Sequence, residues 1–139
     1  MPVPHQIAID AADPHAQARF WAAAMDLEVE DHHDLVVQMI EAGFAADDDH
    51  EQVDGRHRWR DAAACRSADG RTRLLFQAVP EPKDGKNRVH LDLHVGAERR
   101  DDEVARLLDL GATRLWEGQQ GPHRWVTLAD PEGNEFCVG

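Results

Sequence analysis

Two stretches of the chain, 84 residues apart, share one pattern: a strand followed by a helix. Ile7 and Ile9 alternate with small or polar neighbours, which predicts a strand with one buried face. Asp13-Pro14 then marks a helix start, because the Asp side chain accepts from free backbone N–H groups and Pro suits the first turn. The same alternation returns from Val89 onward. An internal repeat of this kind predicts two modules of like design.

The remainder of each half continues the pattern. After the second strand an acidic first turn (residues 101–103) and an apolar stripe predict a helix, and Gly111 stands where a left-handed cap is needed. Residues 124–138 and residues 62–77 each read as two extended runs around a small polar turn that ends in Gly. Each half is therefore predicted to run strand, helix, then further strands.

A chain of 139 residues suits a single domain, residues 1–139. We expect module one at about residues 1–79 and module two at about 88–139, joined by a linker rich in Pro and Gly. Module one carries an extra segment, roughly residues 31–55, which we interpret as an inserted helix and an acidic loop. The run of residues 47–51, with three successive Asp, is expected to be that solvated loop.

Charge and cysteine content indicate which partners and which cellular compartment suit this chain. Fifteen basic and 27 acidic residues give a net charge of −12, which repels nucleic acid and anionic membrane surfaces. The longest apolar run, residues 20–25, is too short to span a bilayer, and the N-terminus lacks the features of a signal peptide. Two cysteines fit a reducing compartment. We therefore expect a soluble, cytoplasmic protein.

The repeated βαβββ pattern, with the sequence DPEGN before the last strand, resembles the vicinal oxygen chelate superfamily of glyoxalases, extradiol dioxygenases and fosfomycin or bleomycin resistance proteins. Residues 59–66, 73–95 and 130–138 are most similar to its actinobacterial-type glyoxalase-like domain proteins. The resemblance implies an α+β fold in which two βαβββ modules form one cup-shaped mixed sheet with the helices outside. It also implies a small-molecule ligand in the cup. Together with the small size of the chain, it predicts a homodimer.

Metal-dependent relatives place His, Gln or Glu at four positions, two in each half. On that pattern Gln6 and His90 are acceptable ligand types, whereas Leu75 and Cys137 stand where carboxylates are expected. Leucine cannot ligate a metal, so the usual set for a divalent metal cofactor is incomplete. The metal candidates are His90, Gln6 and Cys137.

A second possible metal arrangement combines His90 and His94 with Asp92 or His5. If Val89, Leu91 and Leu93 face the helices, the polar residues between them must face the cup. His90, Asp92 and His94 are then available either to a metal or directly to a bound molecule.

Three functions remain open. In the first, a small organic molecule binds in the cup and is sequestered, or is transformed without the usual metal. His90 is then the catalytic acid or base and Asp92 orients it, while the ligand-binding residues are Gln6, Gln77, His94, Trp125 and Cys137. In the second, the protein is a metal-dependent lyase, isomerase or dioxygenase with shifted ligands around His90. In the third, it is a non-catalytic, drug-sequestering binder that uses Trp59 and Trp125 for stacking.

Overall fold

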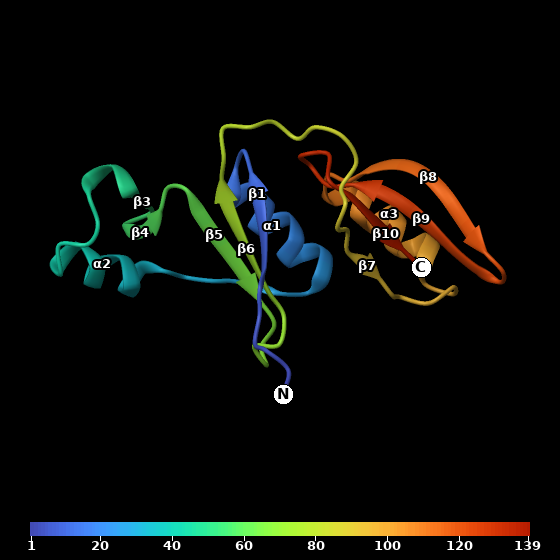
Figure 1. Cartoon of the computed structure of the whole chain (residues 1–139), viewed down its shortest axis with the longest axis horizontal. Coiled ribbons are helices and arrows are strands. Elements are labelled where there is room, and N and C mark those ends of the chain that lie inside the picture. The colour runs from blue at the N-terminus through green and yellow to red at the C-terminus, as the bar shows by residue number, and fades with distance from the viewer. The chain divides into compact units, whose positions relative to one another are not determined.

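The computed structural model describes all 139 residues and belongs to the α+β class. By the density of internal contacts it divides into two compact units. The first comprises Met1–Ala22 and Asp26–Pro80, and the second comprises Ala23–Met25 and Glu81–Gly139. Each unit contains a four-stranded mixed sheet (Figure 1). None of the helices has the length and apolar character needed to cross a membrane.

The first unit follows the predicted strand–helix order. Its elements are β1 (Ile7–Ala11), most of α1 (Pro14–Met25), β2 (Glu28–Val29), β5 (Ala62–Arg66) and β6 (Arg73–Ala78). Asp13 caps α1, its side chain accepting from the Ala16 N–H at 3.0 Å. The sheet order is β1-β6-β5-β2, with β1 parallel to β6 and the other pairs antiparallel. Buried Leu74 and Phe76 anchor it.

The second unit repeats this topology. Its elements are β7 (Asp92–Leu93), α3 (Arg100–Leu110), β8 (Thr113–Gln120), β9 (His123–Ala129) and β10 (Glu135–Val138). The order β7-β10-β9-β8 again places the first strand parallel to the last. Gly111 ends α3 with φ 119°, in the left-handed region, as predicted. The two βαβββ modules expected from the sequence are confirmed.

Strand register supports the 84-residue offset. Ala8 pairs with Leu75 across β1 and β6, and Asp92 pairs with Cys137 across β7 and β10. Because Ala8 and Asp92 are 84 residues apart, Leu75 and Cys137 occupy equivalent places in their modules. Neither place carries a carboxylate.

The strand expected from Val89 to Val95 is only partly formed, since β7 itself covers two residues. Backbone hydrogen bonds to β10 extend it, because the Leu91 and Leu93 carbonyls accept from the N–H groups of Cys137 and Gly139. Val89 precedes this pairing and is 82% exposed, so the expectation that it faces the helices is wrong. An unpaired residue has no sheet face to fix its side chain.

The inserted segment is more ordered than the sequence indicated. It contains α2 (His33–Glu41), the 3₁₀ turn η1 (Asp47–Asp49) and β3 (His50–Val53), which forms a hairpin with β4 (Arg56–Trp59) just beyond residue 55. Asp54 and Gly55 join the strands with φ of 51° and 77°, the backbone of a tight hairpin turn. The acidic run therefore leads into a strand and does not remain a loop.

This hairpin corrects one pairing made from the sequence. Trp59 lies on β4, the second strand of this hairpin, whereas Trp125 lies on β9. The counterpart of β9 in the first unit is β5, because both are the inner strands next to the last strand of their modules. Trp59 and Trp125 are therefore not equivalent residues.

One ion pair ties the strands of the first sheet together. Arg73, at the start of β6, donates from Nε to Glu30 Oε2 at 2.7 Å and from Nη2 to Oε1 at 3.2 Å, and its Nη1 donates to Gln6 Oε1. Glu30 follows β2 and Gln6 precedes β1, so a single guanidinium reaches both edges of the sheet. Burial raises the pKa of Glu30, but hydrogen bonds from Arg73 and His32 outweigh it and hold the pKa below the ordinary 4.5.

We expect Glu30→Gln to lower the free energy of unfolding by about 1–2 kcal/mol at pH 7, because it removes a charge-assisted pair. A lowered folded-state pKa adds stability above the unfolded pKa and loses it as pH falls through the folded one, so the deficit should disappear well below pH 4.5. Urea unfolding from pH 7 to pH 3 measures this. Glu28→Gln, at an exposed residue of β2, is the control, and a deficit that persists at pH 3 contradicts the assignment.

Candidate functional site

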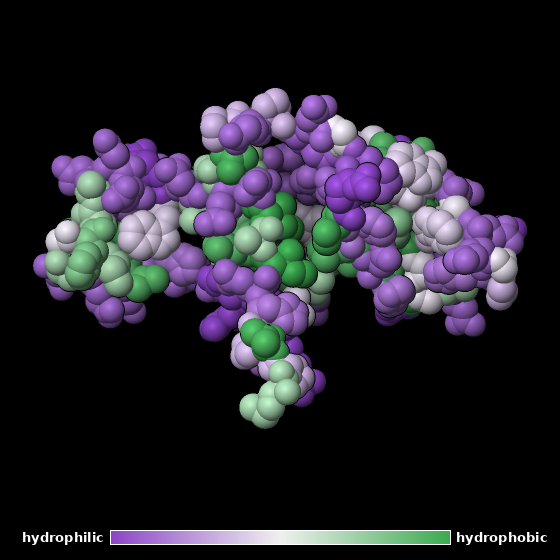
Figure 2. Space-filling view, in the orientation of Figure 1, coloured by the Kyte–Doolittle hydropathy of each residue, from purple (hydrophilic) through white to green (hydrophobic).

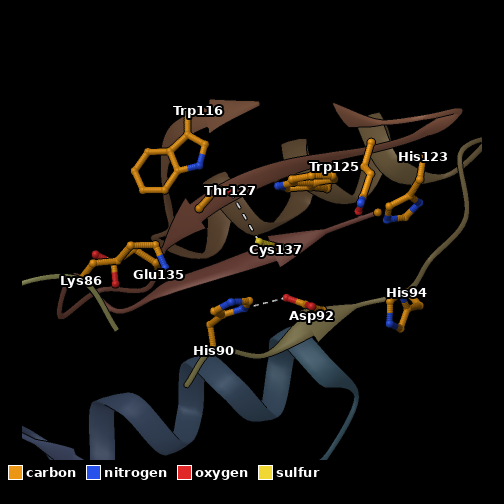
Figure 3. A pocket seen from close by; sticks show the side chains of 12 residues that line it. Lys86, His90, Asp92, His94, Trp116, His123, Trp125, Thr127, Glu135 and Cys137 are labelled. Atoms are coloured by element: carbon orange, nitrogen blue, oxygen red, sulfur yellow. Dashed lines mark hydrogen bonds and ion pairs between the residues drawn. The ribbon is translucent and has the colours of Figure 1, made fainter. Parts of the chain in front are cut away.

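The second unit contains a cavity of about 400 Å³ on the open face of its sheet (Figure 3). Residues two apart along a strand share a face, and the lining follows that rule. The segment through β7 contributes His90, Asp92 and His94; β8 contributes Trp116 and Gln120; β9 contributes His123, Trp125 and Thr127; β10 contributes Glu135 and Cys137; Lys86 and Gly139 complete it. The histidines and aromatic residues converge on one space.

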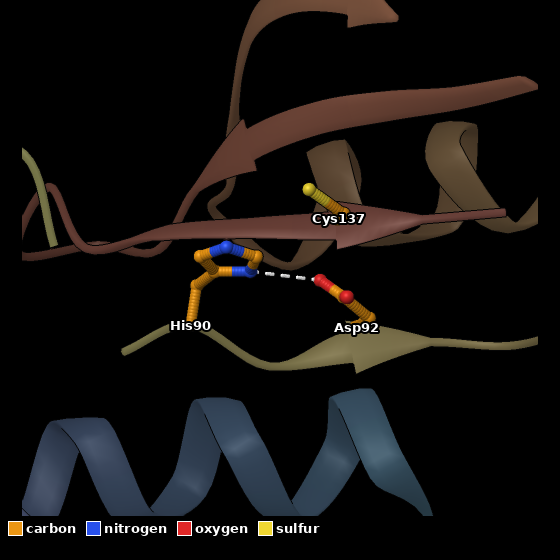
Figure 4. A group of neighbouring side chains, drawn as sticks. All are labelled: His90, Asp92 and Cys137. Atoms are coloured by element: carbon orange, nitrogen blue, oxygen red, sulfur yellow. Dashed lines mark hydrogen bonds and ion pairs between the residues drawn. The ribbon is translucent and has the colours of Figure 1, made fainter. Parts of the chain in front are cut away.

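His90 and Asp92 form the closest polar contact in the cavity. The His90 Nδ1 and the Asp92 Oδ1 are 2.8 Å apart, with the two side chains 38% and 48% exposed (Figure 4). An acidic partner at Nδ1 selects the tautomer protonated there and leaves Nε2 as an acceptor. A pair this exposed contributes little to stability. Its geometry instead fixes the orientation of the imidazole ring.

Cys137 lies on β10 beside this pair. Burial raises the pKa of its thiol, which the nearby Asp92 raises further, while a contact with Thr127 Oγ1 at 3.5 Å acts in the opposite direction. The sulfur is therefore a protonated thiol at neutral pH and a poor nucleophile. One donor atom from each of His90, Asp92 and Cys137 lies within 4.8 Å of the other two.

Trp125 owes its position to a glycine. Gly118 on β8 pairs with Trp125 on β9, and a Cβ at Gly118 would overlap the indole ring. The backbone there is not left-handed, so glycine is needed for close approach and not for an unusual φ. The ring also contacts His123, with centroids 5.7 Å apart. Trp116, 46% exposed, supplies a second indole to the cavity.

Both carboxylates of the cavity have partners. Glu135 is neutralised by Lys83 at 3.3 Å and accepts from the Asn87 N–H at 2.9 Å. Burial raises the pKa of Glu135, but the contacts with Asn87 and Lys83 outweigh burial and hold the pKa below its ordinary value. Asp92 pairs with His90, and Lys86 adds a positive charge to the lining.

The sequence-predicted site residues divide between the units. His90, Asp92, His94, Trp125 and Cys137 lie together in the cavity. Gln6 and Gln77 belong to the first unit, where Gln6 accepts from Arg73 and Gln77 is an exposed residue of β6.

Several lining residues were not singled out from the sequence. They are Lys86, Trp116, Gln120, Thr127 and Glu135. The alternation of Trp116, Gly118 and Gln120 along β8 was the signal available for this face. Trp116 could not be placed without knowing that β8 pairs with β9.

We expect Gly118→Ala to destabilise the protein by about 1–3 kcal/mol, because the added methyl group displaces the Trp125 indole. The indole emission should change with it. Thermal unfolding and tryptophan fluorescence, read against Trp125→Phe to isolate that ring's signal, measure both effects. Gln119→Ala, at the exposed neighbouring residue, is the control. A Gly118→Ala protein with parental stability and emission would show that the indole does not rest on Gly118.

Comparison with known proteins identifies the family to which this chain belongs. Residues 6–139 match the family model described as "Glyoxalase-like domain". No curated protein matches the chain significantly.

Solved structures share the fold at low sequence identity. One is a glyoxalase/bleomycin resistance protein/dioxygenase family enzyme from Burkholderia phytofirmans PsJN, with a TM-score of 0.64 and 17% identity, covering 96% of this chain and 94% of its own. Another is the hypothetical protein SA1046 from S. aureus, with a TM-score of 0.65 and 13% identity over 99% and 93%. A third is the fosfomycin resistance protein FosX from Listeria monocytogenes, complexed with Mn(II) and 1S,2S-dihydroxypropylphosphonic acid. Its TM-score is 0.63 at 11% identity over 99% and 89%.

Proposed function

Because this chain belongs to the glyoxalase-like domain family, we propose that it binds a small organic molecule in the second-unit cavity and moves a proton on it through His90. The observation that carries the proposal is the hydrogen bond of 2.8 Å between His90 and Asp92 beside two indole rings. Asp92 holds the Nδ1 proton, so Nε2 can accept a proton from the bound molecule and later return it. The pair does this without the usual metal.

Binding and orientation would come from the aromatic walls. Trp125 and Trp116 offer flat apolar faces, and His94, Gln120 and His123 offer hydrogen-bonding groups. A cavity of about 400 Å³ admits a small ligand with a planar part and a few polar atoms. Gln6 and Gln77, as residues of the first unit, are retained as ligand-binding candidates on sequence position alone.

The second candidate is a non-catalytic binder of the drug-sequestering kind. The pairing of Trp116 with Trp125 in one cavity favours it, with Trp116 in the place first given to Trp59. A metal-dependent lyase, isomerase or dioxygenase is less favoured, because Leu75 and Cys137 stand where that chemistry uses carboxylates. The three candidates differ in whether His90 or Trp125 is indispensable.

One variant series separates catalysis from binding. A panel of aromatic and carbonyl compounds is first screened by thermal shift on the full chain, and hits are then followed for binding and conversion. We expect Trp125→Ala to weaken binding about fivefold or more. His90→Gln and Asp92→Asn should leave binding within about twofold but slow conversion about 100-fold or more.

Glu98→Gln, which removes an exposed carboxylate of the second unit that does not line the cavity, is the control and should change neither. Tight binding without conversion, insensitive to His90→Gln, would establish the sequestering candidate instead. Hits that bind equally well to the parent and to Trp125→Ala would place the site elsewhere.

We also propose a cytoplasmic homodimer with a small molecule as its only ligand class, not nucleic acid or a membrane. Both cysteines are free thiols, which suits a reducing compartment, and the charge of −12 disfavours polyanions. The dimer would form through the insertion, where Leu35, Phe44 and Val53 are 43%, 80% and 42% exposed. Figure 2 shows apolar residues gathered over the insertion.

We expect the parent to sediment as a dimer at micromolar concentration and Phe44→Asp to shift it toward monomer, because a buried charge opposes an apolar interface. Analytical ultracentrifugation over a concentration series measures this. Val3→Asp, which alters an exposed apolar residue outside the insertion, should leave the dimer intact. A parent that stays monomeric at every concentration contradicts the proposal.

A further inference from the structure

The metal site implied by the vicinal oxygen chelate resemblance does not fit this chain. Of its four positions, Leu75 offers no donor atom, and Gln6 already accepts a hydrogen bond from Arg73. The register places Leu75 and Cys137 at matching points of the two modules, so both carboxylates of that set are absent. Residues from both modules therefore do not supply the usual cage.

A different donor set lies within the second unit alone. Cys137 and Asp92 are register partners on neighbouring parallel strands, and His90 lies two residues before Asp92 on the same face. One donor atom from each lies within 4.8 Å of the others (Figure 4). Donors around a tetrahedral zinc ion are roughly 3.5 Å apart, so rotamer adjustments of about 1 Å would bring all three to bonding distance.

We propose that His90, Asp92 and Cys137 form a three-ligand site for a thiophilic divalent ion such as zinc. This inference does not rest on the proposed acid–base function, which belongs to the metal-free protein, because a bound ion occupies the same imidazole and carboxylate. The thiol loses its proton to solvent as the sulfur–metal bond forms, so each ion bound releases one proton from Cys137. Three protein ligands leave a coordination position for water or another donor.

The donor types decide which ion is taken. Magnesium and calcium require shells of oxygen ligands, and this cluster has one carboxylate. An imidazole and a thiolate favour zinc and its neighbours among the later transition metals. Thr127, 3% exposed, lies 3.5 Å from the sulfur through its hydroxyl and helps to fix the thiolate in place.

Cobalt(II) is the probe, because thiolate ligation to cobalt gives a charge-transfer absorption that nitrogen and oxygen ligands do not. The full chain, kept reduced with a non-thiol reductant, is titrated with Co(II) and then with Zn(II). We expect the band to appear with one equivalent and to vanish when zinc displaces cobalt. Cys137→Ser should abolish it, and His90→Gln and Asp92→Asn should each weaken cobalt binding at least tenfold.

The chain supplies a matched control in its other cysteine. Cys65 is fully buried on β5 of the first unit, and burial raises the pKa of its thiol to about 11. Cys65→Ser should keep the full band, with circular dichroism showing that both serine variants are folded.

Three results overturn the proposal: a folded parent with no thiolate band, a band equally lost in both serine variants, or an Asp92→Asn protein with parental affinity. None of these bears on the proposed function, which is tested by ligand binding to Trp125→Ala without metal.

Discussion

The parallel pairing of the first strand with the last in each module is the constraint on which the rest of the structure depends. Parallel neighbours cannot be joined by a tight turn, so a helix and two further strands must intervene before the chain returns. That return sets Cys137 beside Asp92 and Leu75 beside Ala8. Two residues 45 positions apart in the sequence thereby become neighbours on one sheet face.

The cavity follows from this arrangement and from one small residue. With β7 next to β10 and β9 next to β8, the alternating residues of four strands share an open face. Gly118 lets the Trp125 indole lie close against β8, where the ring forms part of the cavity lining.

The parts of the fold that depend on local signals could be predicted from the sequence. The Asp13 cap and the Gly111 cap each rest on a few adjacent residues, and the structure has them. Strand β1 also forms as predicted, but Ile7 on its expected buried face is 37% exposed. The hairpin in the insertion was also locally encoded, by Asp54-Gly55 between two extended runs, but the acidic run before it favoured a loop interpretation. These competing local signals explain why the hairpin was interpreted as a loop.

The site was harder to predict from the sequence, because it depends on pairing between strands that are far apart in the chain. His90, Asp92 and His94 could be grouped by alternation alone, whereas Trp116 required the β8–β9 register and the closeness of Cys137 required the β7–β10 register. The roles of these residues remain predictions.

The register also separates the frame of a module from its chemistry. Asp92, Thr127 and Cys137 of the second unit correspond to Ala8, Ala64 and Leu75 of the first, and by the same count Trp125 corresponds to Ala62. At these four positions the first unit keeps the backbone plan of the second and carries only alkyl side chains. A second site could therefore be designed into this chain by placing these four side chains of the second unit at the matching positions of the first.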